Sequence, residues 1–223
     1  MNLRYAVFDM DGTLIDSLII WNVIWTKFGE KYRRDPSFRP TSDDDRRIRT
    51  MTMIDAMNYI DETYHFGVGG AELDRYATEI CADFYEHDVK MKDGALAFLR
   101  VLQKNGVRMC IATATDMKLI RVAIKHLQLD EYFETVLSCA EIGKGKDQPD
   151  IYLAALNHFG ADAKDAWVFE DSAVALVTAK SIGIHTVGLF DACNYGQDIL
   201  QREADFYIAD GETLMRLVDN DLI

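Results

Sequence analysis

Cysteine is scarce in this 223-residue chain, and its four copies lie far apart: Cys81, Cys110, Cys139 and Cys193. Neither a CxxC pair nor a cluster of cysteine with histidine is present, although structural zinc sites need such spacing. The pattern argues against a structural zinc site and is typical of a protein kept in a reduced compartment. We therefore expect a cytoplasmic protein.

Basic side chains are also in deficit. Lys and Arg number 24 against 37 Asp and Glu, which leaves a formal net charge of −13. Nucleic acids and anionic membrane surfaces are bound through basic faces. We therefore expect neither nucleic acid nor a membrane as a partner, and the charge carries no information about oligomeric state.

A long hydrophobic run is missing as well. The longest apolar-leaning stretch, Leu14–Trp25, is interrupted by Asp16, Ser17 and Asn22, so it predicts no membrane span. Near the N-terminus, Asp9 comes too early for the apolar region of a signal peptide.

Apolar residues, by contrast, make up 49% of the chain, which is enough for a real core. Short apolar runs alternate with segments of helical spacing, and the runs are continuous, as in buried parallel strands. The alternation predicts an α/β fold with a doubly wound, Rossmann-like parallel sheet. The expected strands are Arg4–Phe8, Val107–Ala112, Thr135–Ser138, Ala166–Glu170, His185–Phe190 and Asp205–Ala209.

Helix signals stand between these runs. Asp93 and Asp116 are expected to cap the helices that follow them, and Pro149 marks the first turn of another helix. Asp171 precedes a further helical segment. We expect it to cap that helix in addition to any role in a site.

Residues 16–90 differ from the rest, because they show helical spacing and no convincing strand. Apolar faces recur around Trp25, Met57 and Tyr76, and Asp43–Asp45 is interpreted as a solvated helix start. We expect a helical cap domain at 16–90, inserted into a core formed by 1–15 and 91–223. Its two connections would act as a double hinge, so that the insert serves as a lid.

Polar residues follow several of the expected strands. In an open α/β sheet, ligands bind beyond the carboxyl ends of the strands, so these side chains are expected to converge. Those after the first strand are acidic and precede a Gly-Thr turn, and a lysine lies in "GKGKDQPD". The converging residues are Asp9, Asp11, Thr113, Ala114, Lys146, Glu170 and Asp171.

Several carboxylates in one crevice repel each other and take up protons unless a cation binds them. Oxygen ligands in a small site favour Mg²⁺. A lysine and a hydroxyl beside the metal suit a phosphate group, and backbone N–H groups at the Gly12-Thr13 turn would add donors. Such a site predicts phosphoryl transfer, in which one aspartate attacks phosphorus and another moves protons.

"DMDGTLID", residues 9–16, resembles the DxDGT[LV]xD signature of the haloacid dehalogenase superfamily. Thr113 after "MCIA" matches the second motif of that family, and Lys146 in "GKDQPDIY" is similar to its K-P-x-P-D-x-[FY] pattern. "VFEDS", Val168–Ser172, matches the acidic motif. Four ordered motifs on expected strand ends are a specific signal. Their order resembles the helical-cap subgroup that includes β-phosphoglucomutase-like and phosphoglycolate-phosphatase-like proteins.

The resemblance implies a role for each acidic residue. Asp9 would be the nucleophile, forming an aspartyl-phosphate, and a metal ligand. Asp11 would be the general acid and base, and its backbone carbonyl would ligate the metal. Asp171 would be a further ligand, with Glu170 beside it or ligating directly. The implied cofactor is Mg²⁺, and the implied phosphate-binding residues are Gly12, Thr13, Thr113, Ala114 and Lys146.

The chain departs from the family pattern around the lysine. Asp147 and Gln148 stand where relatives have proline and a small residue, and Lys144 is a nearby rival of Lys146. None of these departures removes a chemical group. They leave the loop geometry around Lys146 open.

Three functions remain in competition. A Mg²⁺-dependent phosphatase of a small phosphorylated metabolite is favoured over a phosphomutase of the β-phosphoglucomutase type. Mutases carry a cap His and an Arg, whereas Trp21 and Met53 (in "TMTM", residues 50–53) fall in those regions here. Arg46, Arg47 or Arg49 could replace that arginine under a shifted register. A phospho-accepting receiver fits badly, because it is about half this length and places its phospho-accepting Asp well after the acidic pair.

Overall fold

The computed structural model describes residues 3–49 and 51–219. The chain forms two compact units. One, the core unit, consists of Met1–Leu18 and Val89–Ile223, and the other, the helical unit, consists of Ile19–Asp88. Thr50, the first residue of "TMTM", lies outside the described residues.

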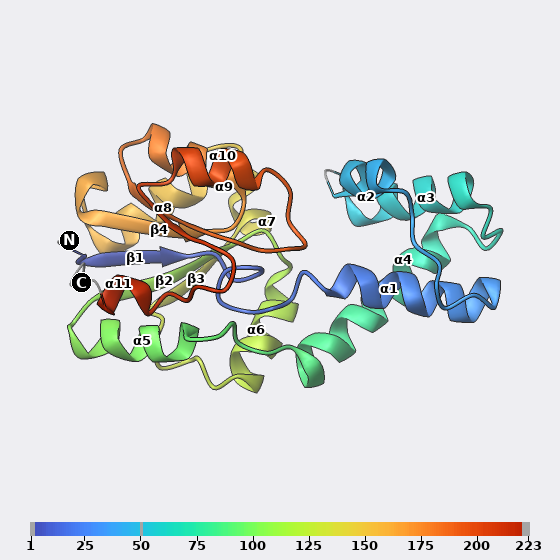
Figure 1. Cartoon of the computed structure of the whole chain (residues 1–223), viewed down its shortest axis with the longest axis horizontal. Helices are drawn as coiled ribbons and strands as arrows, with labels where there is room; N and C mark the ends of the chain where they lie inside the picture. The colour runs from blue at the N-terminus through green and yellow to red at the C-terminus, as the bar shows by residue number, and fades with distance from the viewer. Residues whose placement is uncertain (1–2, 50, 220–223) are drawn as a thin grey trace. The chain divides into compact units, whose positions relative to one another are not determined.

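The core unit is built on a parallel sheet of six strands in the order β3-β2-β1-β4-β5-β6. This order, with helices on both faces (Figure 1), confirms the predicted doubly wound α/β fold. The strands are β1 Tyr5–Phe8, β2 Arg108–Thr113, β3 Thr135–Ser138, β4 Ala166–Glu170, β5 His185–Leu189 and β6 Phe206–Ile208.

The central strands are buried on both faces, which explains their continuous apolar sequence. Val7 of β1 and Val168 of β4 pack in one apolar cluster with Tyr152. The neighbouring Phe8 and Phe169 stack with ring centroids 4.4 Å apart. Successive side chains of a strand point to opposite faces, so each strand contributes to two core layers. Burying each large apolar side chain contributes roughly 1.5–3 kcal/mol.

Helices cover the two faces of the sheet. In Figure 1, α8, α9 and α10 lie on one face, and α5 and α6 lie on the other. The helices of the core unit are α5 Ala95–Lys104, α6 Met117–His126, α7 Cys139–Ile142, α8 Asp150–Phe159, α9 Ala173–Ser181, α10 Gln197–Glu203 and α11 Arg216–Asp219, with a short 3₁₀ turn, η3, at Ala163–Asp165.

Two of the predicted helix caps are wrong. Asp116 does cap α6, since its carboxylate accepts from the Lys118 N–H at 2.8 Å. In contrast, α5 begins after Gly94 without a side-chain cap, so Asp93 does not cap it. The cap of α9 is Ser172. Asp171 does not serve as this cap; its carboxylate oxygens accept instead from the Thr13 hydroxyl and the Asn194 amide.

Three segments of the helical unit were predicted to form helices with an apolar face, and all three form helices. Ile24, Trp25 and Phe28 of α1 are buried, as are Met57 of α3 and Ala77 of α4. Its elements are α1 Ile20–Phe28, α2 Ser42–Ile48, α3 Met53–Tyr64 and α4 Gly70–Asp83, with π-helical turns η1 Gly29–Arg33 and η2 Phe84–Asp88.

The acidic start of α2 is more than a solvated helix end. The Asp44 carboxylate accepts hydrogen bonds from the Tyr59 and Tyr64 hydroxyls, each at 2.5 Å. Asp45 accepts from Arg49 Nε at 2.8 Å and from the Trp25 indole at 3.3 Å. These carboxylates therefore join α2 to the helices around it.

The two chain segments that connect the units pair with each other inside the core unit. The Asp16 N–H donates to the Lys90 carbonyl at 2.9 Å, and the Lys92 N–H donates to the Leu14 carbonyl at 2.9 Å. Ile15 and Met91 form an antiparallel bridge between these bonds. Whether the segments act as a hinge stays a prediction.

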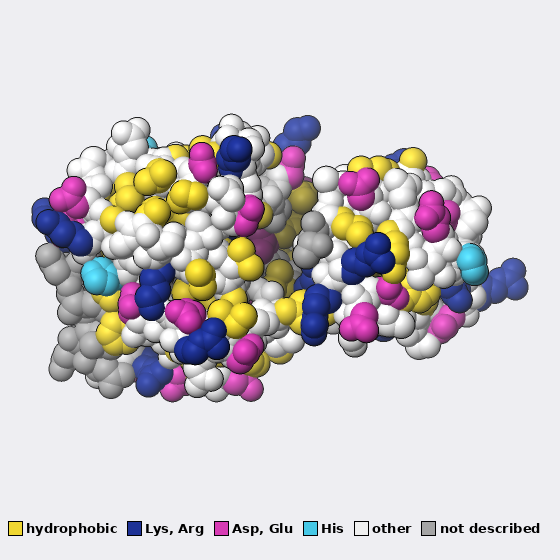
Figure 2. All heavy atoms as spheres, turned by 90° about the horizontal axis from the view of Figure 1, so that it is seen from above, with side chains coloured by type: hydrophobic (Ala, Val, Ile, Leu, Met, Phe, Trp, Pro, Cys, Tyr) yellow, Lys and Arg dark blue, Asp and Glu magenta, His cyan; other side chains and the backbone are white. Residues whose placement is uncertain are grey.

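Charged side chains of both signs are interspersed on the face that Figure 2 shows. Among the described residues, no helix has the length and apolar character that crossing a bilayer requires.

Candidate active site

Two adjacent strands deliver the acidic residues to the same edge of the sheet. β1 and β4 are in parallel register with Phe8 opposite Phe169, so Asp9 follows one strand where Glu170 ends the other. The Asp9 N–H donates to the Phe169 carbonyl at 2.9 Å, which continues the ladder past Phe8. Asp171 comes next in the chain.

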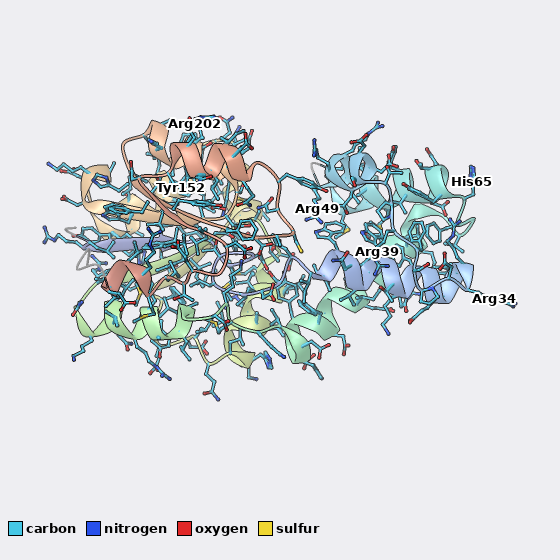
Figure 3. All side chains as sticks on the ribbon, viewed as in Figure 1. Arg34, Arg39, Arg49, His65, Tyr152 and Arg202 are labelled. Carbon is cyan, nitrogen blue, oxygen red and sulfur yellow. The ribbon has the colours of Figure 1, made fainter. Side chains whose placement is uncertain are left out.

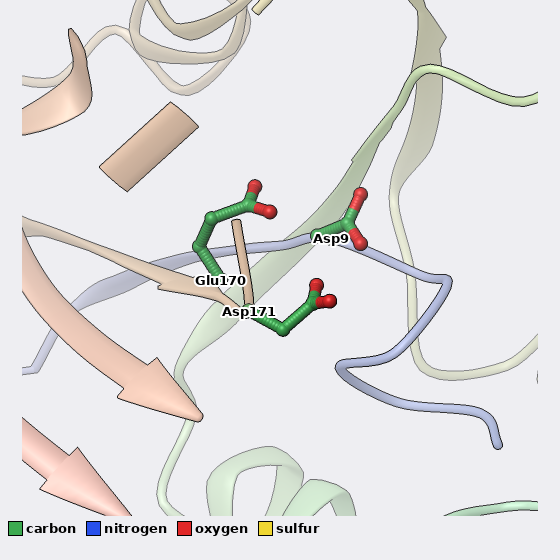
Figure 4. Close-up of side chains that lie close together, drawn as sticks. All are labelled: Asp9, Glu170 and Asp171. Atoms are coloured by element: carbon green, nitrogen blue, oxygen red, sulfur yellow. The ribbon is translucent and has the colours of Figure 1, made fainter. Parts of the chain in front are cut away.

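Asp9, Glu170 and Asp171 form a buried carboxylate cluster. Each offers an oxygen that lies within 4.8 Å of the others, and the residues are only 7%, 2% and 2% exposed. Figure 4 shows their side chains extending from the ends of β1 and β4 into a common space. The structure thus brings together three of the four predicted metal ligands by their carboxylates.

Asp11 does not belong to this cluster. It is partly exposed, and its Oδ1 accepts from the Ser17 hydroxyl at 2.6 Å. The expected metal contact of Asp11 is through its backbone carbonyl, and that contact stays a prediction. After burial and the charge of Glu170, the Asp11 carboxylate is a further cause that raises the pKa of Asp9.

The electrostatics of the cluster favour the protonated forms of Asp9 and Asp171. Burial raises the pKa of Asp9 well above its usual value, and the charge of Glu170 adds to this shift, against the opposing ammonium of Lys146. Burial and Glu170 also raise the pKa of Asp171 to about 7, although a hydrogen bond from Asn194 opposes the shift. A bound cation would supply the positive charge that stabilises the ionised carboxylates.

Lys146 enters the cluster from the segment between α7 and α8. Its ammonium donates to Asp9 and, at 2.8 Å, to Glu170 Oε2, and its side chain is 9% exposed. Lys144 is exposed on the same segment. Of the two rival lysines, Lys146 is thus the one that reaches the carboxylates, despite the unusual Asp147 and Gln148 beside it.

Thr113 lies at the end of β2, the other neighbour of β1. Phe8 is in register with Ile111, so Thr113 reaches the same sheet edge as Asp9. Its hydroxyl oxygen is buried and accepts from the Thr115 N–H at 3.0 Å, which leaves the O–H to act as a donor. Ala114, the next expected phosphate contact, is exposed.

The Gly12-Thr13 turn touches Asp171. The Thr13 hydroxyl donates to Asp171 Oδ1 at 3.0 Å, and Gly12 adopts a φ of 80°. The Gly12 N–H donates to the Ile15 carbonyl at 3.0 Å. This N–H is used inside the turn, and the expectation that the turn presents N–H groups to a phosphate stays a prediction. The glycine serves the turn and the close approach to Asp171.

Two residues of the site were missed in the sequence. The Tyr152 hydroxyl, from α8 (labelled in Figure 3), donates to Glu170 Oε2 at 3.4 Å. The Asn194 amide donates to Asp171 Oδ2 at 2.7 Å. Tyr152 occupies the [FY] position of the lysine motif, which is a signal that could have indicated it. Asn194 lies in an irregular loop after β5, where no motif pointed to it.

The arrangement suits nucleophilic and acid–base chemistry at a phosphorus centre. A carboxylate next to a lysine, further carboxylates for a cation and a strand-end hydroxyl are the parts that phosphoryl transfer needs. The carboxylates and the hydroxyl lie at the carboxyl ends of β1, β2 and β4, and the lysine reaches the carboxylates from the segment between α7 and α8. This is the edge at which open α/β sheets bind ligands.

Comparisons with known proteins agree with this interpretation. The chain is 24% identical over 203 residues to a phosphorylated carbohydrates phosphatase of Thermotoga maritima, covering 91% of this chain and 92% of that protein. It is 25% identical to hexitol phosphatase A of Escherichia coli, covering 85% and 84% of the two chains.

Solved structures share the fold. A Thermotoga maritima protein provisionally described as a beta-phosphoglucomutase superposes with a TM-score of 0.81 at 23% identity, covering 97% of this chain and 99% of that one. The model of the haloacid dehalogenase-like hydrolase family matches residues 6–189. The chain therefore belongs to the haloacid dehalogenase-like hydrolase family.

Proposed function

We propose that the protein is a Mg²⁺-dependent phosphatase that hydrolyses a small phosphomonoester through an aspartyl-phosphate on Asp9. The observation that carries this proposal is the buried cluster of Asp9, Glu170 and Asp171 with Lys146 at the strand ends. The relatives named as phosphatases of phosphorylated carbohydrates and hexitols support the same class of reaction.

The donor set fits a magnesium ion. Within the part of the chain that the structure describes, the cluster offers carboxylate oxygens and no sulfur or imidazole ligand, as hard divalent cations prefer. Asp9 and Asp171 would hold the ion, with Glu170 and the backbone carbonyl of Asp11 as further ligands. When bound, Mg²⁺ supplies positive charge that offsets the carboxylates and the phosphate oxygens.

In this proposal, Asp9 is the nucleophile. Its carboxylate oxygen forms a bond to phosphorus while the bond from phosphorus to the leaving oxygen breaks. Asp11 gives its proton to the leaving oxygen, which departs as an alcohol. Asp11 then removes a proton from water, whose oxygen attacks phosphorus. The bond between phosphorus and Asp9 breaks, inorganic phosphate leaves, and both residues return to their starting forms.

Lys146 and Thr113 hold the phosphoryl group in this scheme. The Lys146 ammonium already contacts Asp9, so it can donate to the phosphoryl oxygens both in the substrate and after transfer to Asp9. The Thr113 hydroxyl, at the end of the adjacent strand, supplies a neutral donor. Both residues act by position and charge and need not exchange protons.

Water, rather than a second sugar hydroxyl, is the proposed acceptor. Met53, at the position expected for the arginine of mutases, is the first residue of α3 and carries no charge. Arg49 is held by an ion pair with Asp45 at 2.8 Å. We further propose that the helical unit acts as a cap that sets substrate choice. A sugar phosphate, phosphoglycolate or a flavin-precursor phosphate are the classes to screen.

The test is a phosphate-release screen over small phosphomonoesters, with and without Mg²⁺, run in parallel on Asp9→Asn. We expect Mg²⁺-dependent release by the parent protein and none by the variant, whose fold is checked by circular dichroism. An isomerised sugar phosphate without free phosphate would replace the phosphatase with a mutase. Undiminished release by Asp9→Asn would remove the proposed nucleophile.

A further inference from the structure

We propose that Asn194 is a positioning residue for Asp171, and that the Lys92–Asp191 ion pair holds Asn194 in place. The inference rests on the proposed function, because it assumes that Asp171 binds the metal. It concerns a loop outside the carboxylate cluster, residues 190–196. This loop orients one metal ligand, and it is hydrogen-bonded to the segment that returns from the helical unit.

Asn194 contacts Asp171 through the NH₂ group of its side-chain amide. Its Nδ2 donates to Asp171 Oδ2 at 2.7 Å and to the Asp171 carbonyl oxygen at 3.2 Å. Its Oδ1 accepts from the Tyr195 N–H at 2.8 Å. A flipped amide would lose all three bonds, so the surrounding donors and acceptors set its orientation.

Asp171 is thereby held at both carboxylate oxygens. Thr13 donates to Oδ1 at 3.0 Å, and Asn194 donates to Oδ2. Two fixed donors restrict rotation of the carboxylate about its terminal bond. Each carboxylate oxygen can accept more than one bond, so an oxygen with one donor can still ligate a cation. Partners of this kind orient metal ligands in other proteins.

Asp191 builds the turn that delivers Asn194. Its Oδ1 accepts from the Cys193 N–H at 2.7 Å, and its carbonyl accepts from the Asn194 N–H at 3.1 Å. The carbonyl also accepts from Gln197 Nε2 at 3.2 Å. Asp191 is 5% exposed, so its charge needs a partner.

Lys92 is that partner. Its ammonium donates to Asp191 Oδ2 at 2.6 Å and to the Phe190 carbonyl at 3.2 Å, from a side chain that is 21% exposed. One cation thus fixes both the carboxylate and the backbone at the start of the loop. Truncating Lys92 would leave a buried carboxylate without this ion pair, and the turn would be expected to shift.

Lys92 lies where the chain re-enters the core unit. Its own N–H donates to the Leu14 carbonyl at 2.9 Å, next to the Ile15–Met91 bridge. A continuous set of contacts therefore runs from the returning segment through Lys92, Asp191 and Asn194 to Asp171. We infer that the affinity for Mg²⁺ depends on Lys92, although Lys92 is not a ligand.

Isothermal titration of the metal-free full-length protein with Mg²⁺ tests the inference without substrate. Asn194→Ala is expected to weaken Mg²⁺ binding about 10- to 100-fold, the range found when outer partners of metal ligands are removed. The exposed Asn157→Ala on α8 is the matched control, and should bind like the parent protein. An affinity of folded Asn194→Ala equal to that of the parent would overturn the inference.

Lys92→Met and Asp191→Asn provide an independent test at a distance. We expect both to weaken Mg²⁺ binding in the same direction, whereas the exposed Lys90→Met leaves it unchanged. In turnover assays, the Mg²⁺ concentration for half-maximal rate should rise while the rate at saturating Mg²⁺ recovers. General structural damage would lower the saturating rate instead, and that result would contradict a positioning role.

The outcomes separate the inference from the proposed function. If the parent protein binds Mg²⁺ and Lys92→Met and Asn194→Ala bind it equally well, the inference fails while the metal site stands. If the parent protein binds no Mg²⁺, the proposed function fails at its metal, and the inference falls with it.

Discussion

Gly12 lies directly against Asp171. A Cβ built at position 12 would stand 2.3 Å from Asp171 Oδ2, and the φ of 80° is one that L side chains rarely adopt. The turn that follows β1 and the residue that follows β4 are thus in contact, although Gly12 and Asp171 are 159 positions apart in the sequence. The glycine is needed at this point for two reasons, backbone conformation and space, and they can be tested separately.

Gly12→Ala should therefore lower the free energy of unfolding by more than the strain of an alanine in the left-handed conformation. A left-handed conformation costs a non-glycine residue ~1–2 kcal/mol. The control is Gly106→Ala, where φ is 72° but a Cβ would meet nothing within 4 Å. We expect Gly12→Ala to lose more free energy of unfolding than Gly106→Ala in urea titrations, and to lose Mg²⁺ affinity as well. Equal losses in the two variants would show that the contact with Asp171 is unimportant.

Asp11→Asn should separate metal binding from turnover. The asparagine keeps an oxygen for the Ser17 hydroxyl and leaves the backbone carbonyl unchanged, so Mg²⁺ should still bind. It cannot exchange the proton that the leaving oxygen requires, so the rate should fall by about 10²–10⁴-fold. Calorimetry and phosphate release measure the two effects. Loss of Mg²⁺ binding in a folded variant would argue against this division of roles.

Lys146→Met should destabilise the metal-free protein. It leaves Asp9 and Glu170 without the ammonium that contacts both, and removing one partner of a buried ion pair costs ~3–5 kcal/mol. Added Mg²⁺ should restore part of the loss. The exposed Lys144→Met should change the free energy of unfolding by less than ~0.5 kcal/mol. Similar effects from the two variants would contradict the choice of Lys146 over Lys144.

Magnesium itself should stabilise the fold. A ligand that binds only the native state raises the free energy of unfolding by ~2.7 kcal/mol at 100 times its dissociation constant. We expect the melting temperature to rise with Mg²⁺ and to fall on chelation. Asp171→Asn should reduce the shift, because it removes one carboxylate of the cluster. A melting temperature that does not change at any Mg²⁺ concentration would contradict the proposed metal site.

Acid should weaken the helical unit through Asp44. Hydrogen bonds from Thr41, Tyr59 and Tyr64 lower the pKa of this carboxyl from 3.8 to about 2. Because the folded-state pKa is depressed, the contribution is complete above the unfolded-state value and is lost as the pH falls toward 2. Urea unfolding across this window should show a flatter pH dependence for Asp44→Asn. The exposed Asp43→Asn should behave like the parent protein.

The sheet could be predicted closely, since every expected strand is present with each end within one residue. Strands buried on both faces need continuous apolar residues, and that requirement is visible in a short window of sequence. The same logic placed Asp9, Thr113 and Glu170 at one edge, because parallel strands share their carboxyl ends. Two of the helix caps were predicted at the wrong residue. Asp93 and Asp171 are good capping residues, but Gly94 and Ser172 hold those positions.

The sequence alone indicated the carboxylates, the lysine and the strand-end hydroxyl, because strand ends and ordered motifs constrain them locally. Which groups touch depends on the path of loops and on side-chain directions. Asn194 reaches Asp171 only through a turn built on Asp191, and that turn is anchored by Lys92, 99 positions earlier. No local pattern encodes such a contact, since its energy exists only when distant segments are packed together.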